Sequence, residues 1–185
     1  MIKKKIVLIL SIFIILIVAI IVETDTINKF LYPKKYSQYV EKYSNEYNLD
    51  DNLVYSVIKA ESKFRPKAQS YKGAKGLMQI SDITRDWAME ELDMENIDIF
   101  DPETNIMIGC WYLNKLYKEF GSIDLVVAAY NGGSGNVRKW LNNNEYSNDG
   151  QILHNIPFEE TSDYVRKVSK NYKKYNDIYN KKGRD

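Results

Sequence analysis

Glu61 is the residue whose place in the sequence most directly predicts chemistry. It follows Val54 by seven positions and Val57 by four, so on a helix it continues the apolar face rather than the polar one. It also lies near the end of that predicted helix, where the helix dipole disfavours a negative charge. Burial and the dipole both raise the pKa of a carboxyl group, and a general acid must be protonated near neutral pH. On spacing alone, a glutamate turned to solvent at a frayed helix end stays open as an alternative.

The other chemistry-bearing residues exclude several classes of site and partner. The 185 residues contain one Cys and one His, too few for a Cys/His zinc site or a disulfide framework. Cys110 and His154 are the only pair that could form a thiol peptidase, but Cys110 lies on the apolar face of a predicted helix, as a small buried side chain does. The 26 basic and 25 acidic residues give none of the basic excess typical of nucleic-acid binders. We therefore expect no metal, no cofactor and no nucleic-acid partner.

The elements that must position Glu61 are helical. Apolar residues recur at helical spacing, and Ser81, Asp101 and Ser122 are typical N-cap residues. Helices are predicted over residues 36–47, 51–62, 81–92, 101–120, 122–130 and 158–181. Strand alternation is hardly present, and only the segment from Gly76 to Ile80 could be extended. The basic residues from 167 to 174 on the last helix indicate a face turned to solvent. The predicted fold class is all-α.

The N-terminal segment predicts the compartment. Lys3, Lys4 and Lys5 precede an uncharged run over residues 6–22, at the short end of the roughly 17–25 residues that cross a bilayer as a helix. Because lysines stay cytoplasmic, the rest of the chain would lie outside a single-pass membrane anchor. A cleaved signal peptide that releases a secreted protein is the alternative, and a buried core helix is a weaker one. The predicted organisation is an anchor over residues 1–22, a linker over 23–35, a folded domain over 36–181 and a tail over 182–185.

Four short sequence motifs occur in order along the folded domain. They are Glu61-Ser62, Gly76-Leu77-Met78-Gln79, Ala129-Tyr130-Asn131, and Glu160-Thr161 with Tyr164-Val165. In this order they resemble the soluble lytic transglycosylase (SLT) family, the bacterial murein-cleaving relatives of goose-type lysozyme. The resemblance implies a lysozyme-like domain that binds peptidoglycan glycan strands.

The same resemblance assigns roles to individual residues. It implies that Glu61 is the sole catalytic acid and base, and that Tyr164 directs its hydroxyl towards that carboxyl. The remaining matches would bind substrate or line the cleft: Ser70, Met78, Gln79, Tyr130, Asn131 and Glu160.

A single catalytic carboxyl implies a particular reaction. A glycosidase that hydrolyses its substrate normally uses two carboxyl groups, and the acids nearest in sequence, Asp82 and Asp86, are explained by the start of a helix. One carboxyl suffices if the 6-hydroxyl of N-acetylmuramic acid (MurNAc) attacks its own anomeric carbon, so that the MurNAc-β-1,4-N-acetylglucosamine (GlcNAc) bond is cut without water and leaves a 1,6-anhydro-MurNAc end. A hydrolysing lysozyme and a catalytically silent peptidoglycan-binding module are the alternatives.

Overall fold

The computed structural model describes residues 26–180 together with Leu10. Its labelled helices, in chain order, are α2 (Ser37–Glu46), α3 (Asp51–Glu61), α4 (Asp82–Glu91), α5 (Pro102–Phe120), α6 (Ile123–Gly132), α7 (Ser134–Leu141) and α8 (Glu159–Tyr179). Residues 26–31 are also helical. Within the described part of the chain, the only β pairing consists of isolated bridges from Lys75 to Gln69 and to Ile80. The all-α prediction is therefore confirmed, although α7 was not predicted.

Most of the predicted membrane anchor, residues 1–22, lies outside the described residues, as does the tail over residues 182–185. In the residues that are described, no helix has the length and apolar character needed to span a bilayer.

Helix starts follow the predicted capping residues. The side chains of Ser81, Asp101 and Ser122 each accept a hydrogen bond from the backbone N–H three residues further on, in α4, α5 and α6. Asp50 caps α3 by accepting from the Asn52 N–H at 2.8 Å. Each cap satisfies a backbone donor that the first helical turn leaves without a partner. The start of α3 is thereby fixed, and with it the position of Glu61 at its end.

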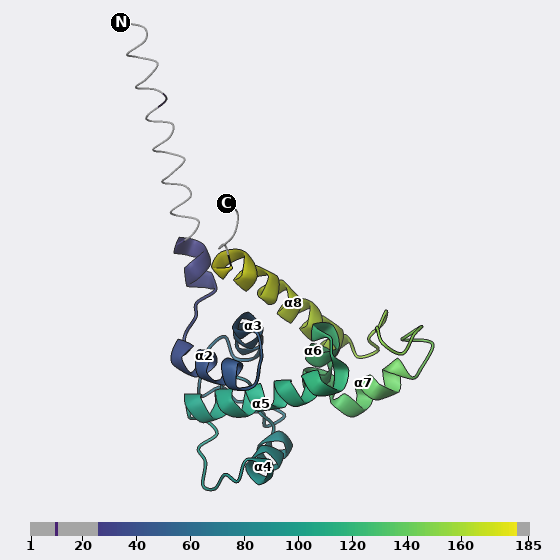
Figure 1. The fold of residues 1–185 in the computed structure, drawn as a ribbon, viewed down its shortest axis with the longest axis horizontal. Helices are drawn as coiled ribbons and strands as arrows, with labels where there is room; N and C mark the ends of the chain where they lie inside the picture. The colour runs from purple at the N-terminus through teal and green to yellow at the C-terminus, as the bar shows by residue number, and fades with distance from the viewer. Residues whose placement is uncertain (1–9, 11–25, 181–185) are drawn as a thin grey trace, which may run out of the picture.

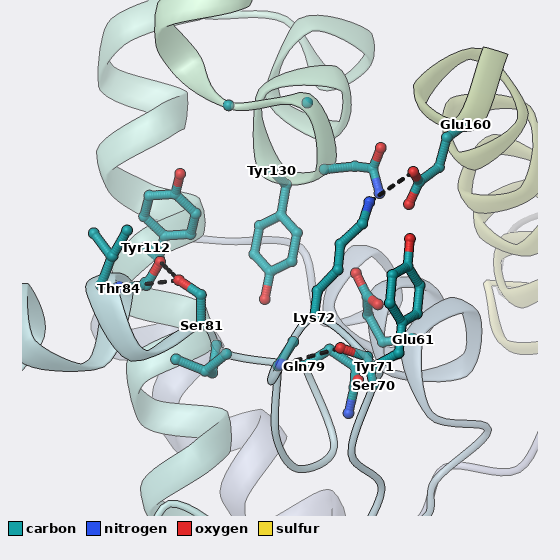
Figure 2. A pocket seen from close by; sticks show the side chains of 16 residues that line it. Glu61, Ser70, Tyr71, Lys72, Gln79, Ser81, Thr84, Tyr112, Tyr130 and Glu160 are labelled. Carbon is teal, nitrogen blue, oxygen red and sulfur yellow. Dashed lines mark hydrogen bonds and ion pairs between the residues drawn. The ribbon is translucent and has the colours of Figure 1, made fainter. Parts of the chain in front are cut away.

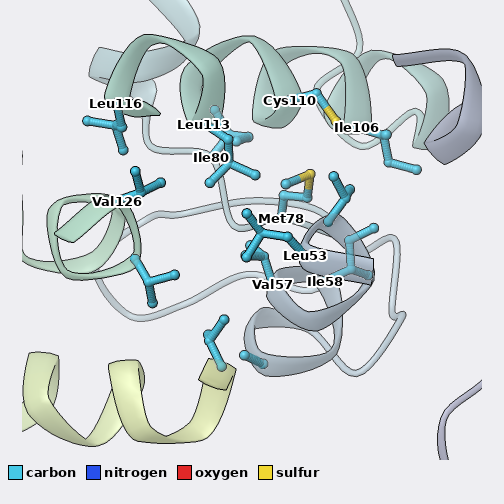
Figure 3. Close-up of a cluster of buried hydrophobic side chains, with 14 of the residues drawn as sticks. Leu53, Val57, Ile58, Met78, Ile80, Ile106, Cys110, Leu113, Leu116 and Val126 are labelled. Carbon is cyan, nitrogen blue, oxygen red and sulfur yellow. The ribbon is translucent and has the colours of Figure 1, made fainter. Parts of the chain in front are cut away.

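Helix α3 occupies the centre of the molecule. It packs against α8 on one side and α2 on another, while α6 bridges α8 and α5 (Figure 1). All residues from Asn52 to Ile58 are buried, so α3 lacks the polar face that a surface helix would have. Figure 3 shows Leu53, Val57 and Ile58 facing a layer of side chains from α5. A core helix enclosed in this way carries Glu61 on a rigid support.

The loop between α3 and α4 is held in place by α5. The buried Asn105 of α5 accepts a hydrogen bond from the Met78 N–H at 2.8 Å and donates to the carbonyls of Lys75 and Ile99. Gly76 lies directly against this amide, because a Cβ at position 76 would come within 2.1 Å of Asn105 Nδ2. Gly76 also has a φ of 82°, in the left-handed region that glycine adopts without strain. Glycine is thus required at position 76 for two reasons.

The segment predicted as a linker packs onto the domain. Tyr179 donates a hydrogen bond from its hydroxyl to the Tyr32 carbonyl at 2.7 Å, and Tyr175 donates to the Pro33 carbonyl at 3.1 Å. The rings of Tyr32 and Tyr175 also meet edge to face, with centroids 5.5 Å apart. Residues 32 and 33 are therefore part of the folded body rather than a loose tether.

Candidate active site

A cavity of about 500 Å³ opens beside the end of α3. It lies between the α3–α4 loop, the start of α4, the middle of α5, the end of α6 and the start of α8 (Figure 2). The residues that line it are Glu61, Ser70, Tyr71, Lys72, Ala74, Gln79, Ile80, Ser81, Ile83, Thr84, Tyr112, Tyr130, Asn131, Gly132, Gly133 and Glu160. Six of the eight residues predicted to form the site meet in this one cavity.

Glu61 is the last residue of α3 and is partly buried at the base of the cavity. Burial raises the pKa of its carboxyl from 4.5 to about 7, and the negative charge of Glu160 adds to this. The Tyr164 hydroxyl and the Lys167 ammonium group act in the opposite direction on the pKa, but burial has the larger effect. At neutral pH the carboxyl is therefore protonated in a large fraction of molecules. Such a group can donate a proton and later accept one.

Tyr164, in the first half of α8, lies near Glu61. Its side chain is buried, and its hydroxyl has no hydrogen-bond partner among the described residues. The hydroxyl is nevertheless near enough to lower the pKa of Glu61, although the two groups do not meet in full hydrogen-bond geometry. A buried hydroxyl normally has a partner. This unpaired donor beside the carboxyl can stabilise Glu61 when it loses its proton.

Tyr130 joins the α6 wall of the cavity to the α3–α4 loop. Its hydroxyl donates a hydrogen bond to the Met78 carbonyl at 2.8 Å, and its ring packs against Tyr112 with centroids 5.4 Å apart. Figure 2 shows the Tyr130 ring standing between Tyr112 and Glu61. Because the hydroxyl is already bonded, Tyr130 offers the cavity its ring rather than a free polar group.

Asn131, the next residue of α6, contributes a polar atom that is not satisfied within the protein. Its Oδ1 is buried and has no hydrogen-bond partner among the described residues. A buried amide oxygen without a donor is costly unless a ligand supplies one. Since Asn131 lines the cavity, its Oδ1 is a candidate acceptor for a substrate N–H or O–H group.

Ser70 and Gln79 lie in the α3–α4 loop, which forms one wall of the cavity. Ser70 Oγ accepts a hydrogen bond from the Ala74 N–H at 3.0 Å and so closes the turn over residues 70–74. Gln79 Nε2 donates to the carbonyls of Ala68 and Gly76, and the Gln79 backbone has a φ of 50°. A left-handed backbone at a residue with a side chain is uncommon, and such strain is concentrated at functional sites. Both side chains are thus held by the loop while lining the cavity.

The predicted place of Met78 in the cleft wall does not match the structure. Its side chain is fully buried and packs beneath α5, where a Cβ at Gly109 would come within 2.2 Å of the Met78 sulfur (Figure 3). The loop is held against α5 at this point, since the Met78 N–H donates to Asn105 Oδ1, and it is the neighbouring residue, Gln79, that lines the cavity. Met78 contributes to the site through its backbone carbonyl, the acceptor for Tyr130.

Glu160 closes one side of the cavity together with a residue that sequence reasoning missed. Lys72 Nζ lies 2.9 Å from the Glu160 carboxylate, and both side chains are exposed. The pair joins the loop over residues 70–74 to the start of α8 above Glu61 (Figure 2). No signal in the sequence pointed to Lys72, since the two partners are 88 positions apart. Tyr112 was also missed, because a tyrosine at helical spacing is typical of core packing.

Lys167 was assigned to a solvent-exposed face by the sequence pattern. The side chain is exposed, but its Nζ donates a hydrogen bond to the Ala60 carbonyl, in the last turn of α3. It thereby satisfies a backbone acceptor at a helix end and places a positive charge near Glu61. In the described part of the chain, no group of three or more His, Cys, Asp or Glu side chains could hold a metal ion.

Comparisons with known proteins agree with this arrangement. Residues 38–153 match the family described as the transglycosylase SLT domain. The soluble lytic murein transglycosylase of Escherichia coli strain K12 is 34% identical over 143 residues, which cover 74% of this chain and 22% of that protein. The membrane-bound lytic murein transglycosylase F of Desulfosudis oleivorans is 38% identical over 106 residues, covering 54% of this chain and 22% of the relative.

Solved structures show the same fold. An inactive mutant of the lytic transglycosylase Slt from Pseudomonas aeruginosa superposes with a TM-score of 0.73 at 27% identity, over 82% of this chain and 25% of that one. The 70-kDa soluble lytic transglycosylase of Escherichia coli gives a TM-score of 0.72 at 30% identity, with the same coverage. The chain thus spans about a fifth to a quarter of the length of these relatives. From the family match and the shared fold, the chain belongs to the transglycosylase SLT domain family.

Proposed function

We propose that this protein is a peptidoglycan lytic transglycosylase that cuts the MurNAc-β-1,4-GlcNAc bond and leaves 1,6-anhydro-MurNAc ends. The observation that carries the proposal is Glu61, a carboxyl group in the cavity whose burial raises its pKa to about 7. The names of the relatives, which describe murein transglycosylases, support the substrate class.

The proposed reaction needs one carboxyl group in two roles. Protonated Glu61 donates its proton to the bridging oxygen, the bond from this oxygen to C1 of MurNAc breaks, and GlcNAc leaves with a free 4-hydroxyl. The C6 hydroxyl oxygen of the same MurNAc then bonds to C1, and its proton passes to the Glu61 carboxylate. Glu61 ends protonated as it began, and no water is consumed. A pKa near the working pH suits a group that must both give and take a proton.

Hydrolysis would require a second carboxylate to attack C1 or to activate water. Among the described residues that line the cavity, the other acid is Glu160. It is exposed, and its Oε2 is ion-paired with Lys72 Nζ, so this carboxylate is held at the rim of the cavity by the loop lysine. This arrangement favours transglycosylation over the lysozyme reaction. The raised pKa of Glu61 also argues against a silent binding module, which would have no use for a protonated buried acid.

Substrate contacts are proposed for the polar groups that the protein leaves available. The unpaired Asn131 Oδ1 would accept a hydrogen bond from an N-acetyl N–H or a sugar hydroxyl. The ring of Tyr130 would pack against a sugar face, while Ser70 and Gln79 would hold the loop wall that the glycan touches. Glu160 would bind sugar hydroxyls at the rim.

We further propose that the domain works outside the cytoplasm, attached to the membrane by the apolar run over residues 6–22 with the N-terminus cytoplasmic. The name of the Desulfosudis oleivorans relative, a membrane-bound transglycosylase, supports this. Secretion after signal cleavage is the alternative, and the N-terminal sequence of the mature protein distinguishes the two.

The activity of Glu61→Gln tests the catalytic assignment. The substitution keeps the size of the side chain and removes the transferable proton, so release of soluble fragments from purified peptidoglycan should fall by about 10⁴-fold, the upper end for general acid–base catalysis. Tyr164→Phe should lower the rate less, because it removes a hydroxyl that acts on the carboxyl rather than on the substrate. Retention of more than about a tenth of the activity by Glu61→Gln would contradict the mechanism. Melting curves of the same samples exclude loss of folding as the cause.

A further inference from the structure

A second pocket, of about 290 Å³, lies between residues 30–35, the end of α3 and the middle of α8. It shares no lining residue with the candidate active site. Four lysines line it: Lys35, Lys59, Lys63 and Lys167. Of the described residues around this pocket, none is an aspartate or a glutamate. The pocket therefore concentrates positive charge with no acidic group in its wall.

Among the described residues, none of the four pocket lysines forms an ion pair. Lys35 and Lys63 are exposed, and neither forms an ion pair within the described part of the chain. Lys59 Nζ donates to the Leu31 carbonyl and lies 4.4 Å from the centre of the Tyr32 ring, and Lys167 donates to a carbonyl of α3. Burial lowers the pKa of Lys59, and the neighbouring charge of Lys63 lowers it further. An anion in the pocket would relieve this repulsion.

The rim of the pocket is apolar. Ile27, Phe30 and Leu31 are exposed, and the Phe30 side chain is 83% accessible to solvent. Phe30 and Leu31 also line the pocket itself. Exposed apolar side chains beside lysines are typical of surfaces that lie on a lipid headgroup layer, where the apolar groups insert and the ammonium groups meet phosphates.

The position of the pocket in the molecule fits such a surface. The helix over residues 26–31 projects from the body next to the C-terminal end of α8, far from α4 and α7 (Figure 1). The hydrogen bonds from α8 to the carbonyls of residues 32 and 33 fix this segment on the domain. In the sequence it comes shortly after the apolar run that ends at Val22.

We propose that the four-lysine pocket and its apolar rim form a docking surface for a membrane of anionic phospholipids, with headgroup phosphates bound by the lysines. The pocket shares no lining residue with the catalytic cavity, although Lys167 also lies near Glu61. Binding of vesicles can therefore be measured without the cleavage reaction. Docking would hold the catalytic domain against the membrane at a fixed face.

Amine-reactive footprinting of the full chain, read by mass spectrometry, tests the proposal. The protein is mixed with vesicles of phosphatidylcholine alone or of phosphatidylcholine with phosphatidylglycerol. Labelling of Lys35 and Lys63 should be slower with the anionic vesicles than with the neutral ones, because each lysine near an anionic surface raises the affinity for it by about fivefold. Lys139, which is exposed on α7 at the far side of the molecule, serves as the internal control and should not change.

Two further arms make the result decisive. The double variant Lys35→Gln/Lys63→Gln should lose the protection of Lys59 and Lys167 by anionic vesicles, whereas Lys139→Gln should keep it. Glycerol phosphate added to the neutral vesicles should protect none of the four. Equal labelling in both vesicles, an equal slowing of Lys139, or full protection by the soluble phosphate would overturn the proposal.

Discussion

The buried Glu61 carboxyl makes the stability of this protein depend on pH in a way that Glu61→Gln removes. The pKa of Glu61 is raised from 4.5 to about 7 in the folded state. Between these values the unfolded chain has already lost the proton that the folded protein still holds, so the free energy of unfolding falls as pH rises through this window. A shift of this size corresponds to about 3 kcal/mol above neutral pH.

Glutamine does not titrate, so Glu61→Gln does not lose this stability as the pH rises. The free energy of unfolding of the variant minus that of wild type should therefore be about 3 kcal/mol larger at about pH 8 than at about pH 4. For a domain of this size, the difference in melting temperature between the variant and wild type should therefore change by about 6–12 °C between the two pH values. Thermal unfolding followed by circular dichroism at both pH values measures it. Glu90→Gln, at an exposed position of α4, is the matched control and should show no such change. If the melting temperatures of Glu61→Gln and wild type differed by the same amount at both pH values, the assignment of a buried, protonated carboxyl would be refuted.

The remaining predictions concern the loop that forms the cavity wall. Tyr130→Phe leaves the Met78 carbonyl without its donor and should lower the free energy of unfolding by about 1–3 kcal/mol, as measured by urea titration. Gly76→Ala should destabilise the protein by about 1–3 kcal/mol more than Gly73→Ala. Both glycines have positive φ angles, but a Cβ meets the Asn105 amide at Gly76 and no atom within 4 Å at Gly73. Equal losses for the two glycine variants would show that the contact with Asn105 is unimportant.

Helix positions and the place of Glu61 could be predicted from the sequence because they depend on local rules. The caps at Ser81, Asp101 and Ser122 are set by residues within one turn of each helix start. Glu61 could be found because two signals agreed: its spacing from Val54 and Val57 continues the apolar face of α3, and the motifs around it resemble those of the SLT family. Of the two causes predicted for its raised pKa, burial and the helix dipole, burial is the leading cause in the structure.

Contacts between distant segments could not be predicted in this way. The Lys72–Glu160 ion pair and the hydrogen bond from Lys167 to Ala60 each join residues about a hundred positions apart. Met78 was placed in the cleft because its sequence motif resembles that of the family, but its loop is held against Asn105 of α5, a contact between distant segments.

The central claim, that one carboxyl cuts the glycan without water, is tested most directly by the products. Purified peptidoglycan is digested by the protein, and the fragments are analysed by mass spectrometry with and without borohydride reduction. We predict fragments that end in 1,6-anhydro-MurNAc, which are lighter than hydrolysis products by one water and do not react with borohydride. Fragments that end mainly in reducible MurNAc would contradict the account and show that the protein is a hydrolysing lysozyme.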